Sequence, residues 1–159
     1  MISVHIFSSI ETEPDFVSRA IMKKLKCDYS HIGVAFNGSS LYHATGKGVH
    51  LLTRGEFLKD HKMVHEIPIT KFVHNFSYAR GWCEGNVGKD YSESQFIGFM
   101  FPALKKFFGD GRKEVICSEF VARFIDECTE IDIFDEIDCD YVSPKELIEM
   151  LSEKVFGLK

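Results

Sequence analysis

Short apolar segments separated by turn residues fill the stretch from residue 31 to residue 69, and they constrain the fold more than any other feature. Runs of about four to eight residues bounded by Gly, Asn or Ser are typical of strands. We expect strands at 31–36, 41–44, 49–52 and 64–69, and a further one at 2–7. Three or four of these strands in the middle of the chain predict a small antiparallel sheet or partial barrel.

Helical periodicity flanks this stretch on both sides. A helix start at Thr12-Glu-Pro-Asp15, with Thr12 as its cap, precedes an apolar stripe that includes Phe16 and Leu25. Further helices are expected at about 72–84, 93–108 and 117–127, and a last one begins at Ser143-Pro-Lys-Glu146. Strands in the middle with helices around them indicate the α+β class. The 159 residues suit a single domain, 1–159.

Charge and cysteine content exclude several classes of protein. The net charge is −5 and there is no long basic run, which argues against nucleic-acid binding. The longest apolar stretch, 97–104, is far too short to cross a membrane, and the first residues do not resemble a signal peptide. Five cysteines without a CxxC pair argue against a disulfide framework and a four-thiolate zinc site. We therefore expect a cytoplasmic protein without a transmembrane segment.

Cys117 is the strongest candidate for chemistry. It lies where the strand-like Val115-Ile116 meets a predicted helix. The positive end of a helix dipole favours a thiolate, and the unpaired N–H groups there can bind an oxyanion. Helical spacing places Cys117 on the same side as Val121 and Phe124, facing the sheet. The alternative is that Cys117 is a small buried apolar residue, as most free cysteines are.

A thiolate nucleophile requires a base and a group that orients it. Among seven histidines, His31 opens a predicted strand and His43 lies on the next one. A three-residue turn at 37–39 would pair Gly33 with His43 and put both histidines on one face of the sheet. A two-residue Asn-Gly turn would put them on opposite faces, and the sequence leaves both registers open.

Three segments, taken in order, resemble a known family. They are Ser-His31-Ile-Gly-Val-Ala-Phe, then Leu-Tyr-His43-Ala-Thr-Gly-Lys-Gly-Val49, then Val-Ile-Cys117-Ser-Glu-Phe-Val121. Together they resemble the circularly permuted NlpC-type papain-like superfamily, which is related to the lecithin:retinol acyltransferase-like proteins. The likeness covers roughly residues 30–148. The chain departs from many relatives at Ile116, where an aromatic residue is common.

This resemblance implies a permuted papain-like fold with the nucleophile at a helix N-terminus. It implies Cys117 as nucleophile, His31 as base and His43 as orienting residue. The implied activity is that of a thiol-dependent hydrolase (amidase, peptidase or esterase) or an acyltransferase working through a thioester. No cofactor or metal is expected. The implied partners are a peptide, a cell-wall fragment or a lipid acyl substrate.

Two alternative functions are compatible with the same sequence. The first is a non-catalytic module on the same fold that binds a peptide or lipid through a Phe-rich surface. The phenylalanines at 96–108 could line such a pocket, although a buried helix explains them equally well. The second is a metal-dependent hydrolase that uses several histidines, which the absence of an HExxH motif weakens.

Overall fold

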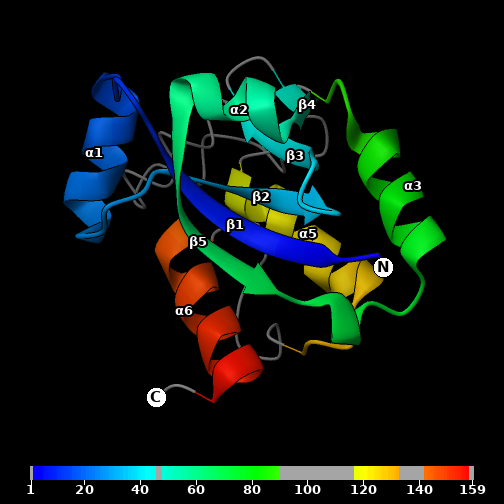
Figure 1. Ribbon diagram of the computed structural model, residues 1–159. Coiled ribbons are helices and arrows are strands. Elements are labelled where there is room, and N and C mark those ends of the chain that lie inside the picture. The colour runs from blue at the N-terminus through cyan, green and yellow to red at the C-terminus, as the bar shows by residue number, and fades with distance from the viewer. Residues whose placement is uncertain (1, 46–47, 90–116, 133–141, 158–159) are drawn as a thin grey trace, which may run out of the picture.

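A five-stranded antiparallel sheet forms the centre of the protein in the computed structural model (Figure 1). The structure describes residues 2–45, 48–89, 117–132 and 142–157. The strand order is β4-β3-β2-β1-β5, so the N-terminal strand lies between β2 and β5. The strands are β1 (Val4–Glu11), β2 (His31–Phe36), β3 (Ser40–Thr45), β4 (Gly48–Thr53) and β5 (His61–Pro68).

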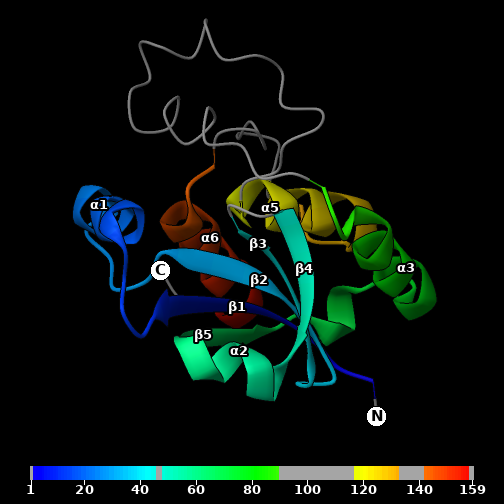
Figure 2. The ribbon, with the colours of Figure 1, turned by 90° about the horizontal axis from the view of Figure 1, so that it is seen from above.

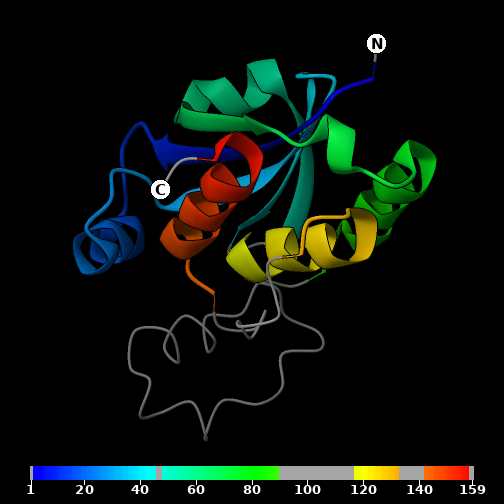
Figure 3. The ribbon, with the colours of Figure 1, turned by 90° about the horizontal axis from the view of Figure 1, so that it is seen from below.

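Helices cover both faces of this sheet. They are α1 (Phe16–Leu25), α2 (Arg54–Asp60), α3 (Phe76–Asn86), α5 (Cys117–Cys128) and α6 (Pro144–Phe156), with a 3-10 turn η1 at Thr70–Phe72. Figures 2 and 3 show α5 and α6 on one face and the short α2 on the other. The α+β class with a small antiparallel sheet packed against helices is thereby confirmed. Within the described ranges, no helix has the length and apolar character needed to span a membrane.

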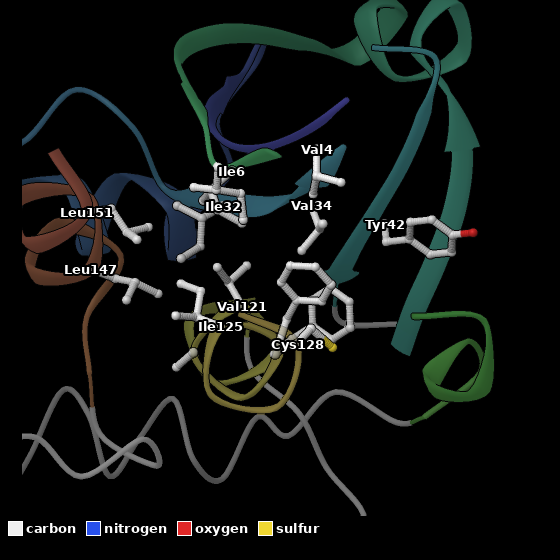
Figure 4. Close-up of a cluster of buried hydrophobic side chains, with 14 of the residues drawn as sticks. Val4, Ile6, Ile32, Val34, Tyr42, Val121, Ile125, Cys128, Leu147 and Leu151 are labelled. Carbon is white, nitrogen blue, oxygen red and sulfur yellow. The ribbon is translucent and has the colours of Figure 1, made fainter. Parts of the chain in front are cut away.

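The main core lies between the sheet and the helices α5 and α6. Val121 and Ile125 of α5 point toward Ile32 and Val34 of β2, as Figure 4 shows. Leu147 and Leu151 of α6 close the side of the same cluster (Figure 4). The packing of α5 against β2 brings the N-terminal end of this helix to the beginning of that strand.

The register of the β2–β3 hairpin settles the alternative that the sequence left open. Phe36 lies opposite Ser40 and Gly33 lies opposite His43, which is the pairing expected for the three-residue turn. Because side chains alternate along a strand, His31 and His43 project from the same face of the sheet. This is the face covered by α2, and it carries a second small core around Phe57.

Several local expectations need correction. The first strand extends to Glu11, and the helix α2 was not expected. Asp15, and not Thr12, caps α1, because its carboxylate accepts a hydrogen bond from the Ser18 N–H. Phe16 is the first residue of α1 and is 81% exposed, so it does not belong to a buried stripe.

The other helical expectations have mixed outcomes. The helix expected from residue 72 begins at Phe76, where Asn75 supplies the cap. The capping box at Ser143 is confirmed in both directions. The expected helix at 93–108 lies outside the described residues.

Candidate active site

Cys117 is the first residue of α5 and is buried, with 4% of its surface exposed. Its Sγ lies 4.0 Å from the carbonyl oxygen of Ser30, the residue before β2, and the thiol donates toward that oxygen. The first N–H groups of a helix have no partner within the helix and carry partial positive charge. The thiol therefore lies at the end of α5 where negative charge is favoured.

His31 is the partner of Cys117 in the structure. It begins β2 next to Ser30, and its side chain is 13% exposed. Its Nε2 lies 3.6 Å from Oε1 of Glu11. Its Nδ1 is buried and has no hydrogen-bond partner among the residues that the structure describes. The Cys117 thiol is the other polar side chain that interacts with the His31 ring.

The surroundings of His31 change its pKa in opposing directions. Burial lowers the pKa, whereas the contacts with Cys117 and Glu11 raise it and outweigh burial. The result is a pKa of about 9 for His31. Both contacts therefore favour the protonated form of the ring, so His31 is suited to accept a proton.

Glu11 completes this arrangement, and the sequence analysis did not identify it. Its Oε2 accepts hydrogen bonds from the Ser18 hydroxyl at 2.7 Å and from the Asp15 N–H at 3.3 Å. Its Oε1 is left to face His31. The contact with His31 is the main cause that lowers the pKa of Glu11 to about 2, with further help from Ser18 and Asp15. The carboxylate is thus ionised and held in place by the first turn of α1.

His43 lies on the same face of the sheet as His31 but makes no hydrogen bond to it. It is 2% exposed, and neither of its ring nitrogens has a hydrogen-bond partner within the described part of the chain. Its ring packs edge-on against Phe57, with 5.1 Å between the ring centroids. Burial, followed by the charges of His31, His61 and His50, lowers the pKa of His43 to about 3. His43 is accordingly a neutral residue of the small core.

A cleft of about 450 Å³ opens beside the site on the Glu11 side. It lies between the end of β1 and the junction of α2 with β5. The lining residues are Glu11, Thr12, Glu13, Lys59, Asp60 and His61. Three carboxylates and one ammonium group give this cleft an excess of negative charge.

The structure thus brings Cys117 and His31 together and adds Glu11 behind His31. No sequence signal near Glu11 marks it, because its contact with His31 depends on the pairing of two strands that are distant in sequence. No protein-family model, curated protein or solved structure matches this chain. The resemblance to the permuted papain-like superfamily therefore stays a prediction that rests on the motifs.

Proposed function

We propose that the protein is a thiol-dependent hydrolase or acyltransferase with Cys117 as its nucleophile. The observation that carries this proposal is that His31 interacts with both Cys117 and Glu11. A thiol, an imidazole and a group that orients the imidazole are the parts that nucleophilic catalysis by cysteine requires. The geometry favours Glu11 over His43 as the orienting group, because Glu11 faces Nε2 of His31 and His43 does not.

We further propose that the fold is of the permuted papain-like type. Two features support this. The histidine begins a central strand and precedes the cysteine in the chain, and the cysteine begins a helix packed on that strand. His43 also lies on the strand that follows His31, where the resemblance implies a polar residue.

The proposed reaction follows from these positions. The proton of Cys117 passes to His31, and the resulting thiolate attacks the carbonyl carbon of an amide or ester. The N–H groups at the start of α5 hold the oxyanion, together with a second donor. His31 then protonates the leaving amine or alcohol as the carbon–heteroatom bond breaks, which leaves a thioester on Cys117.

The second half of the reaction uses the same groups. Water, or another nucleophile, gives a proton to His31 and attacks the thioester carbonyl. The carbon–sulfur bond breaks, and Cys117 recovers its proton from His31. Glu11 stabilises the positive charge on His31 in both halves and is a positioning residue. Peptides, cell-wall fragments and lipid acyl groups are the substrate classes that we propose.

Alkylation with iodoacetamide at pH 7 tests the activated cysteine directly. Cys83 and Cys128 are internal references, because burial raises the pKa of both thiols. We expect Cys117 to react faster than either reference, and the rate to fall at least tenfold in His31→Ala. Mass spectrometry of the peptides measures each site separately.

The matched control for this experiment is His74→Ala. His74 is half exposed and pairs with Glu130 outside the site, so its replacement should leave the rate at Cys117 unchanged. Equal labelling of Cys117 in wild type and His31→Ala would contradict the proposed pair. Ligand binding that survives Cys117→Ala, without turnover by the wild type, would favour the non-catalytic binding module instead.

A further inference from the structure

Three metal-ligating side chains lie together on adjacent strands at one end of the sheet. Glu11 of β1 is paired directly with His61 of β5, and Ser9 of β1 is paired with His31 of β2. Ser9 and Glu11 are two residues apart and project from the same face. Glu11, His31 and His61 therefore share one face of three neighbouring strands, β2, β1 and β5.

The ligand atoms of these residues are close enough for one metal ion. One atom from each of Glu11, His31 and His61 lies within 4.8 Å of the others, and the Glu11–His31 pair is at 3.6 Å. A tetrahedral zinc ion with bonds of about 2.0–2.1 Å needs ligand atoms about 3.3 Å apart. Rotation of its side chain would bring the His61 ring into that range. The rings of His61 and His31 already pack edge-on, with 5.7 Å between their centroids.

The same cluster lies beside a cleft through which an ion could reach it from solvent. Glu11 and His61 line the cleft of about 450 Å³ beside the site, and Glu13 and Asp60 add negative charge to its wall. An ion can enter from this cleft, and the electrostatic attraction of the carboxylates concentrates cations there. Two imidazoles and one carboxylate with a fourth position open to a cleft form a donor set that suits zinc and similar ions.

We propose that Glu11, His31 and His61 form a binding site for a divalent transition-metal ion of the zinc type, and that an ion bound there blocks His31. The ion would take Nε2 of His31, the nitrogen that faces Glu11, and leave the ring proton on Nδ1. A ring in this state cannot accept the proton of the thiol. The site itself stands on geometry, whereas the inhibition rests on the proposed function.

Zinc binding to the chelator-treated protein tests the site without any assay of activity. The titration uses Cys117→Ala, so that the nearby thiol cannot bind the ion. We expect one equivalent of Zn²⁺ to bind to this variant by equilibrium dialysis. We expect a further His61→Ala change to weaken binding at least tenfold, whereas a further His74→Ala change leaves it unaltered.

Two results would overturn the site. One is the absence of stoichiometric zinc binding to Cys117→Ala, and the other is unchanged affinity after His61→Ala. His61→Asn, a smaller polar replacement, repeats the comparison if circular dichroism shows that His61→Ala is misfolded. A loss of affinity in His61→Asn supports the site, and retention of affinity overturns it.

The inhibition is tested by alkylation of Cys117 in the wild-type protein. Saturating zinc should slow this reaction at least tenfold relative to the metal-free rate, and a chelator should restore it. An unchanged rate under saturating zinc would overturn the block of His31 and leave the metal site standing. If Cys117 is alkylated slowly even without metal, the proposed function is contradicted. The equilibrium dialysis result then decides the metal site separately.

Discussion

Glu11 connects the first turn of α1 to the cysteine at the start of α5. One of its oxygens is held by Ser18 and Asp15, and the other faces His31. Because Ser18 and Asp15 hold one oxygen of this carboxylate, the other oxygen keeps a fixed position beside the imidazole of His31. Ser18, whose hydroxyl bonds to this carboxylate, is itself buried.

Replacement of Glu11 by Gln tests this connection at the scale of a single residue. Gln keeps the shape of the side chain but removes the charge that stabilises protonated His31. We expect the pKa of His31 to fall below about 9. NMR titration of the ring protons of wild type and variant would measure this change. We also expect the alkylation rate of Cys117 at pH 7 to fall about tenfold or more, since acid–base groups contribute roughly 10²–10⁴ to rates.

Glu66→Gln is the matched control for this change. Glu66 of β5 pairs with Arg54 of α2 at 2.6 Å, and removal of its charge should leave both measurements unaltered. A chelator is present throughout, so that bound metal does not contribute. An unchanged titration of His31 in Glu11→Gln would show that the carboxylate does not stabilise the imidazolium.

At the scale of elements, the β2–β3 hairpin depends on a glycine. A Cβ at Gly33 would lie 2.5 Å from Cζ of Phe7 and 2.5 Å from the carbonyl oxygen of Tyr42. Phe7 is fully buried and packs edge-on against Phe57, with 5.3 Å between the ring centroids. The ring of Phe7 therefore occupies the space over Gly33 that a side chain there would need.

We expect Gly33→Ala to destabilise the protein by roughly 1–3 kcal/mol, because overpacking displaces buried rings or backbone. Gly81→Ala is the matched control in α3, where an added Cβ meets no atom within 4 Å. This control should raise stability by roughly 0.5–1 kcal/mol, because glycine is unfavourable inside a helix. Unfolding in urea measures both changes, and equal effects of the two would contradict the role of Gly33.

The elements also show how far local sequence signals reach. The strand at His31–Phe36, the start of α5 at Cys117 and the cap of α6 follow from local patterns, and the structure has them at those positions. The helix α2 also has a local sequence signal, because Thr53 and Glu56 form a capping box. Its seven residues are too few for helical periodicity to be visible.

The contact between Glu11 and His31 has no comparable signal. It depends on the antiparallel pairing of β1 with β2 and on a register that the intervening helix α1 does not encode. The choice between His43 and Glu11 beside His31 therefore required the three-dimensional arrangement. The register of His43 with Gly33 was only one of two possibilities because Asn-Gly turns close loops of more than one length.

At the scale of the whole molecule, the sheet separates two cores of different character. The core under α5 and α6 contains a large apolar cluster, and the polar residues Ser118 and Glu119 of α5 are buried as well. The smaller core under α2 combines Phe7, Phe57 and Leu41 with the rings of His43 and His61. Buried imidazoles without partners are stable only in the neutral form, so this second core makes the stability of the fold depend on pH.

His43 sets the sign and the range of that dependence. Burial lowers its pKa from 6.5 to about 3 in the folded protein. Between these values the unfolded chain binds a proton at His43 and the folded protein does not, so stability falls as the pH decreases below 6.5. The loss attributable to this residue is about 2 kcal/mol between pH 6 and pH 4.5 at about 1.4 kcal/mol per pH unit.

We expect His43→Leu to remove this part of the pH dependence of the unfolding free energy. Leucine also keeps an apolar side chain beside Phe57. Urea unfolding of metal-free protein at pH 7, 6, 5 and 4.5 gives the free energies to compare. His74→Leu, a change at a half-exposed position, should retain the wild-type slope. If His43→Leu lost stability in acid as steeply as the wild type, proton uptake elsewhere in the chain would cause the loss, and His43 would not be the group that makes the second core sensitive to acid.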